Sequence, residues 1–175
     1  MPSTRTSPNE VSTGRPQRAA PRIPAEAEAS FPPVSRKLSP DAQDDLIWTR
    51  VLAALEAALD RKATDPVVLD LRGHSQLADY FVILSGRSDT QVRAIAEGVE
   101  ERLRRDKVRP LAVEGQRRGQ WALLDFGDFV VHVFYHPVRE FYDLERLWSR
   151  APQRALPDPL RTAAGADDPS AAAPR

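Results

Sequence analysis

The sequence predicts an α/β (α+β) fold in which a mixed β-sheet of about five strands is flanked by helices. Two helical stripes of apolar residues, at 41–62 and 89–106, alternate with shorter runs that are typical of strands. The runs at 67–71 and 80–84 are almost continuously apolar, as expected for strands that are covered on both faces. A hairpin signal at 126–128 then separates two further strands.

The first helix has recognisable start and stop signals. Ser39 is suited to cap it, and Pro40 fits the first helical position because the missing amide would be unpaired there anyway. Because a residue that precedes proline disfavours helical backbone angles, the helix is expected to end near Lys62, before Pro66.

The second helix is expected at 89–106, with Ser88 and Gln91 in the capping-box pattern. A strand, turn and helix followed by another strand predict a crossover connection on the sheet. The remaining elements are expected to be a short strand at 111–114, strands at 121–125 and 129–135, and one closing helix marked by Phe141, Leu144, Leu147 and Trp148.

Proline and aromatic residues divide the chain into three parts. Residues 1–40 hold eight of the 16 prolines and 151–175 hold five, whereas eleven of the twelve aromatic residues lie in 41–150. Because proline is scarce in packed elements and aromatic side chains supply buried area, we expect one folded domain over 41–150. We expect a disordered Pro-rich extension at 1–40 and a disordered Ala/Pro-rich tail at 151–175.

Charge and composition argue against several classes of function. Sixteen basic and nineteen acidic side chains give 41–150 a net charge of −3, unlike a domain that binds nucleic acid by charge alone. Without cysteine, disulfides and cysteine-ligated metals are excluded. No stretch reaches the ~20 apolar residues of a membrane span, and the first thirty residues lack the apolar core of a secretory signal. We therefore expect a cytoplasmic protein that binds no membrane.

Two patterns resemble metal sites but have structural explanations. His132 and His136 have the spacing of metal ligands on a helix, whereas on the expected strand they lie roughly 13 Å apart. Asp125-Phe126-Gly127 matches the magnesium-binding triplet of protein kinases, but the other kinase motifs are missing. We expect a structural histidine and a hairpin turn, with no metal and no cofactor.

The turn Ser85-Gly86-Arg87-Ser88 leaves a nucleotide-binding or nucleotidyltransferase-like enzyme open as an alternative. It stands at the head of a capped helix, where backbone amides bind phosphate well. Such an enzyme also needs carboxylates that converge on magnesium, and Asp125 and Asp128 are the only nearby candidates. Their spacing does not place both on one face of a strand, so we expect no catalytic residue.

The order and the amino-acid sequences of these segments resemble those of one family, the ribosomal silencing factors of the RsfS or Iojap type. The resemblance covers about 46–150, essentially the whole expected domain. Its motifs are Asp70-Leu71-Arg72, Ala78 to Ile83, Ser85 to Ser88, Gln91 to Ala96, Glu114-Gly115, Gly119-Gln120-Trp121, Leu123-Leu124-Asp125, Gly127-Asp128, Val130 to Phe134, Arg139 to Tyr142 and Leu144 to Trp148.

The resemblance implies a fold similar to nucleotidyltransferases without their activity. It also implies that the protein binds the large ribosomal subunit through its fourteenth ribosomal protein, blocks joining of the small subunit and represses translation when nutrients are short. Organellar members assist assembly of the large subunit, so an assembly factor is an alternative. Because many members are dimers, a homodimer is a further expectation, and the basic stretch 102–118 leaves a peripheral contact with ribosomal RNA open.

We expect the docking surface for the ribosomal protein near the hairpin, because interfaces are anchored by aromatic and Arg side chains. Trp121, Leu123 and Asp125 share one face of their strand, opposite Ala122 and Leu124. If helices cover the face that carries Ala122 and Leu124, the face that carries Trp121 is available for docking. The alternative is that Trp121 and Tyr142 simply belong to the core. The expected partner-binding residues are Tyr80, Arg118, Trp121, Asp125, Asp128, His132, Arg139 and Tyr142.

Overall fold

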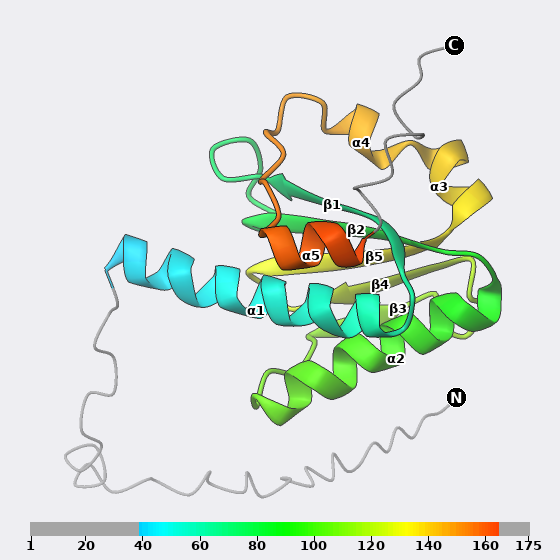
Figure 1. The fold of residues 1–175 in the computed structure, drawn as a ribbon. Helices are drawn as coiled ribbons and strands as arrows, with labels where there is room; N and C mark the ends of the chain where they lie inside the picture. Colours follow the sequence, from blue (N-terminus) through cyan, green and yellow to red (C-terminus); the bar gives the residue numbers. More distant parts are fainter. Residues whose placement is uncertain (1–38, 165–175) are drawn as a thin grey trace, which may run out of the picture. The chain divides into compact units, whose positions relative to one another are not determined.

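The computed structural model describes residues 39–164, which form a five-stranded mixed sheet with helices on both faces (Figure 1). The fold class expected from the sequence is confirmed. Across the sheet the strands follow the order β1-β2-β5-β4-β3. They are β1 (Thr64–Asp70), β2 (Tyr80–Gly86), β3 (Ala112–Glu114), β4 (Trp121–Asp125) and β5 (Phe129–Tyr135). The helices are α1 (Pro40–Asp60), α2 (Asp89–Arg105), α3 (His136–Tyr142), α4 (Leu144–Leu147) and α5 (Asp158–Ala163).

A parallel pair of strands lies at the centre of the sheet. β2 and β5 run parallel, with Gly86 beside Tyr135, and the other neighbouring strands are antiparallel. Parallel neighbours require a long connection, and α2 lies within it, which confirms the predicted crossover. β4 and β5 form the predicted hairpin.

Both long helices begin at the predicted caps. The Ser39 hydroxyl accepts a hydrogen bond from a backbone amide in the first turn of α1, and the Ser88 hydroxyl accepts one from the Gln91 amide (3.1 Å). The Gln91 side chain in turn accepts from the Arg87 amide and donates to the Lys62 carbonyl, each at 2.8 Å. The start of α2 is thereby attached to the end of α1.

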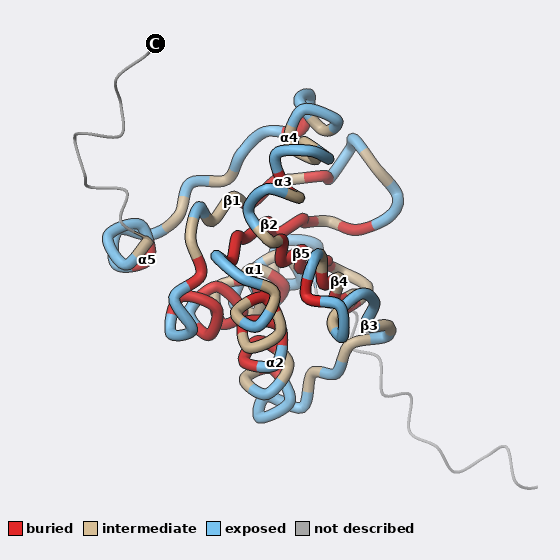
Figure 2. The backbone as a smooth tube through the Cα atoms, turned by 90° about the vertical axis from the view of Figure 1, so that its right-hand side faces the viewer, coloured by how far each residue is buried: buried red, intermediate tan, exposed pale blue. Residues whose placement is uncertain are grey.

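Helices cover the two faces of the sheet unequally. α1 and α2 pack on one face and form the larger core with β2, β4 and β5, which contains Val51, Leu55, Val82, Val99, Leu124 and Val131. On the other face, α3, α4 and the residues after them pack mainly over β1, β2 and β5, where Trp148 contacts Phe81. In Figure 2 the central strands are buried, whereas β3 at the edge is mainly exposed.

The expectation of a single closing helix is wrong. The chain instead forms α3 and α4, which are separated by Asp143 in the left-handed conformation (φ 44°). This break changes which side chains face the core. Leu144 and Trp148 pack on the sheet, whereas Phe141 and Leu147 are 82% and 75% exposed.

The domain also continues beyond residue 150, where the tail was expected to begin. The 152–154 segment runs beside β1, with the Asp70 amide donating to the Pro152 carbonyl and the Arg154 amide donating to the Val68 carbonyl. α5 follows and buries Leu160 in the larger core. The prolines here occupy positions where no amide donor is needed, such as the first turn of α5, so they do not prevent packing.

Of the two segments expected to be disordered, 1–40 and 151–175, residues 1–38 and 165–175 lie outside the described residues. Within the part of the chain that the structure describes, no helix is long and apolar enough to cross a bilayer.

Candidate docking surface

The side chains of β4 alternate between the two faces of the sheet, as the sequence predicts. Ala122 and Leu124 are completely buried under the helices of the larger core. Trp121, Leu123 and Asp125 point to the opposite face and remain partly exposed. The condition set by the sequence, that helices cover the face of β4 that carries Ala122 and Leu124, is therefore met.

An aromatic groove lies at the start of β4, with a volume of about 600 Å³. The Trp121 ring stacks on Phe134 (centroids 4.7 Å apart) and also contacts Tyr142 (5.1 Å). Tyr142 in turn contacts Phe141, and both side chains are largely exposed. We define the aromatic groove by its lining residues Gly115, Arg118, Gln120, Trp121, Tyr135, Pro137, Val138, Phe141 and Tyr142.

His132 supports the groove from below. Its Nδ1 accepts a hydrogen bond from Trp121 Nε1 (3.3 Å), and its ring meets the Phe81 ring edge to face. Burial lowers the pKa of His132 to about 4, so the imidazole is neutral at pH 7. Nε2 is buried and has no hydrogen-bond partner among the described residues. This arrangement agrees with a structural histidine that orients the Trp121 indole.

Two of the expected binding residues lie inside the domain, which corrects the expectation that they contact a partner. The Arg139 side chain is only 10% exposed, and its guanidinium donates to Glu145, the Ser85 hydroxyl and the Asp65 carbonyl. It fastens α3 to α4 and to the ends of β1 and β2. Its donors are used within the fold, so Arg139 is not available to a partner.

Tyr80 is the second buried member of the expected set. Its hydroxyl donates to Asp44 (2.5 Å) and accepts from Arg154, whose guanidinium lies 3.9 Å from the centre of the Trp48 ring. Burial, followed by the hydrogen bond to Asp44, raises the pKa of Tyr80 well above its usual range. The tyrosine thus joins α1, β2 and the 152–154 segment.

The two acidic members of the expected set lie at the far end of the hairpin from the groove. Asp125 accepts a hydrogen bond from the Gly127 amide (2.7 Å) and shapes the turn between β4 and β5. Asp128 lies 3.7 Å from Arg50 of α1. Of the eight expected residues, the structure therefore brings Arg118, Trp121 and Tyr142 together in the groove, with His132 beneath them.

The turn at Ser85–Ser88 and the acidic hairpin lie at opposite ends of the sheet. Gly86 pairs with Tyr135 of β5, whereas Asp125 pairs with Val130, five residues away, which corresponds to roughly 17 Å. Within residues 39–164, no three His, Cys, Asp or Glu side chains gather as metal ligands would. The arrangement required for phosphate transfer with magnesium is not formed by these residues.

The sequence did not identify Phe141 as a groove residue. Its spacing from Leu144 and Trp148 suggested a buried helical stripe, and only the backbone break at Asp143 turns it outward. Pro137 and Val138 were missed because α3 begins earlier than expected.

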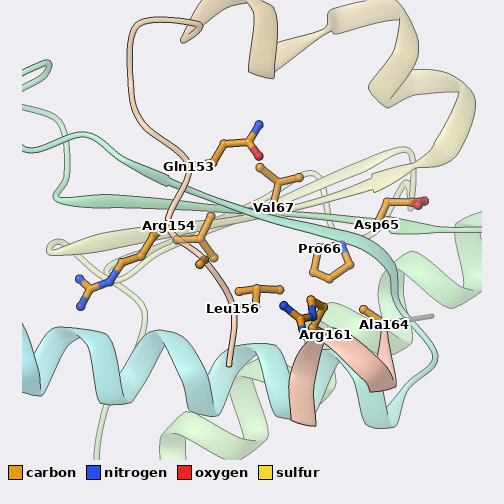
Figure 3. A pocket seen from close by; sticks show the side chains of 10 residues that line it. Asp65, Pro66, Val67, Gln153, Arg154, Leu156, Arg161 and Ala164 are labelled. Carbon is orange, nitrogen blue, oxygen red and sulfur yellow. The ribbon is translucent and has the colours of Figure 1, made fainter. Parts of the chain in front are cut away.

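A second hollow of about 620 Å³ lies between the start of β1, the 153–156 segment and α5 (Figure 3). Its walls include Val67, Gln153, Leu156 and Arg161. It contains none of the expected binding residues and no aromatic side chain. The aromatic groove is therefore the better candidate for a docking site.

Fold and surface together define an α+β domain with a half-covered sheet and an exposed aromatic groove. Residues 45–175 match the family model described as "Ribosomal silencing factor during starvation". The chain belongs to this family, so the resemblance seen in the sequence is confirmed.

Individual relatives and a solved structure agree with this assignment. The chain is 42% identical to the ribosomal silencing factor of Bacillus subtilis over 99 residues, which are 57% of this chain and 84% of the relative. It is 34% identical to the chloroplastic Iojap protein of Zea mays over 67% of this chain and 51% of the relative. A crystal structure of a Chromobacterium violaceum protein, 37% identical, superposes with a TM-score of 0.58 over 59% of this chain and 86% of that protein.

Proposed function

We propose that this protein is a non-enzymatic repressor of translation that acts in the cytoplasm by docking on the large ribosomal subunit. Its contact is the fourteenth ribosomal protein of that subunit, and the bound domain sterically blocks the small subunit when nutrients are short. Family membership supports the ribosomal target. The observation that carries the proposal is the open side of β4, where exposed aromatic side chains surround a groove.

The groove has the chemistry of a protein interface. Interfaces are anchored by aromatic and Arg side chains that become buried at the centre, and the groove offers Trp121, Phe141, Tyr142 and Arg118 together. A stable interface covers about 800 Å² on each partner. The ribosomal protein would therefore contact the uncovered face of β4 and β3 as well as the groove.

Sedimentation with purified subunits tests the proposal. The protein should migrate with the large subunit and reduce the yield of joined ribosomes when small subunits are added. Joining that proceeds normally at saturating protein would contradict steric repression. A pull-down with the isolated fourteenth ribosomal protein should retain the chain, and a different protein of the large subunit, which should not retain it, provides the control.

The assembly role suggested by the organellar relatives predicts a different result. A deletion strain would then accumulate immature large subunits even during rapid growth, whereas a silencing factor affects joining in starved cells.

A second copy of this chain is another partner for the groove, and sedimentation equilibrium of the free protein would reveal that dimer.

A further inference from the structure

Three arginines beside the aromatic groove have no acidic partner among residues 39–164. They are Arg87, which precedes α2, and Arg117 and Arg118 in the loop before β4, and all three are exposed. We call this set the basic rim. Arg118 also lines the groove, so the two features are continuous.

The structure separates the basic rim from the rest of the basic stretch at 102–118. At the end of α2, Arg102, Arg104 and Arg105 form ion pairs one helical turn away, and their partners are Asp106, Glu100 and Glu101. Those arginines are therefore largely neutralised by their own helix. Lys107 and Arg109, which follow α2, also form no ion pair within residues 39–164, but the unpaired arginines of the basic rim lie at the other end of α2, beside the groove.

Backbone contacts bring the parts of the basic rim together. The Tyr135 amide donates to the Gln120 carbonyl (2.9 Å), and Tyr135 lies beside Gly86 in the parallel pair. Two strand spacings of about 4.8 Å thus separate Gly86, which precedes Arg87, from Gln120, which lies three residues after Arg117, a distance of roughly 10 Å. Side chains as long as arginine can reach a common ligand across that distance.

The first turn of α2 lies under the same loop and adds positive potential. The loop approaches so closely that a Cβ at Gly119 would lie 2.3 Å from the Asp89 carbonyl oxygen, so only glycine fits there. The Asp89 carboxylate is 3.3 Å from Arg93, which offsets its charge. The amino end of the helix dipole therefore reinforces the basic rim.

We propose that the basic rim binds the phosphate backbone of ribosomal RNA while the aromatic groove holds the ribosomal protein. The inference rests on the proposed function and adds a second contact to it. Ribosomal proteins are embedded in RNA, so a domain docked on one of them brings its rim close to phosphates. Arginine forks match phosphate oxygens in geometry and charge. Because the 41–150 region has a net charge of −3, this contact is local rather than a general affinity for nucleic acid.

The salt dependence of binding tests this inference. We would compare the full chain with the double variant Arg87→Gln, Arg117→Gln, measuring affinity for purified large subunits between 50 and 200 mM salt, a range over which phosphate contacts produce large changes. Each lost phosphate contact should lower the slope of log affinity against log salt by roughly 0.7–0.9, so the double variant should lose about 1.5. Its affinity for the isolated ribosomal protein should stay unchanged.

A matched control is the double variant Arg104→Gln, Arg105→Gln, which removes the same charge from the far end of α2. Its slope should equal that of the unmodified chain. Equal slopes for all three proteins would exclude the RNA contact and leave the silencing function intact. A reduced slope with the isolated ribosomal protein as well would identify a protein carboxylate as the ligand and overturn the RNA assignment. If the unmodified chain does not bind large subunits, the proposed function itself fails.

Discussion

Replacing Phe141 with alanine should weaken docking while leaving the fold intact. Phe141 lines the aromatic groove and exposes 82% of its surface in the free protein. Complete burial of a phenylalanine side chain is worth about 1.5–3 kcal/mol, so covering the exposed part contributes about 1–2.5 kcal/mol. Since 1.4 kcal/mol corresponds to a factor of ten in affinity, the Kd for the ribosomal protein should rise roughly five- to sixtyfold.

Titration calorimetry with the isolated ribosomal protein measures this change, and thermal unfolding checks the fold. The Tm should shift by no more than about 2 °C, because an exposed side chain contributes little to stability. Leu77→Ala is a suitable control, since Leu77 is 70% exposed but lies in the loop between β1 and β2. Unchanged affinity of Phe141→Ala, or an equal loss in the control, would refute the assignment of the groove. Trp121→Ala is a less selective test because its ring also stacks on buried Phe134.

Three further predictions concern the interior. Tyr80→Phe removes the hydroxyl between Asp44 and the 152–154 segment, and should lower the free energy of unfolding by about 1–3 kcal/mol in urea titrations. Arg139→Ala leaves the mostly buried Glu145 without its cation and should cost about 3 kcal/mol, more than Glu145→Gln in the same titrations. The folded-state pKa of His132, about 4, lies below the usual 6.5, so the unfolded chain takes up its proton first on acidification. Stability should therefore fall by up to about 3 kcal/mol between pH 6.5 and 4, and His132→Leu should remove that part of the slope.

A different result would contradict each of these three predictions. The Tyr80 prediction is wrong if Tyr80→Phe is as stable as the unmodified protein. The Arg139 prediction is wrong if Arg139→Ala loses no more stability than the alanine variant of an exposed arginine such as Arg150. For His132, the decisive quantity is the difference in pH dependence between the two proteins. Identical curves between pH 6.5 and 4 would show that the imidazole titrates normally in the folded state.

Local patterns predicted the central part of the fold well. The capping residues Ser39 and Ser88 lie where they were expected, and β4 and β5 have the predicted bounds. Such features depend on residues that are close in sequence, because a cap or a hairpin turn is satisfied within a few residues. Alternation along β4 even predicted that Trp121 would face away from the helices.

The candidate site required contacts between distant segments. Arg139 and Tyr80 looked like surface anchors, yet each is held inside the domain by at least one partner more than thirty residues away. Conversely, Phe141 looked like a core residue until the backbone break at Asp143 exposed it.

The sequence by itself therefore determined the α+β class, the order of most elements, the family and the face of β4 on which to look. Tertiary structure alone decided which aromatic and charged side chains remain free. It attached the 151–164 segment to the domain and left the arginines of the basic rim without an acidic partner among residues 39–164. The physical reason is that exposure and charge pairing depend on which surfaces meet across the sheet, whereas helix caps, turns and strand alternation depend mainly on neighbours along the chain.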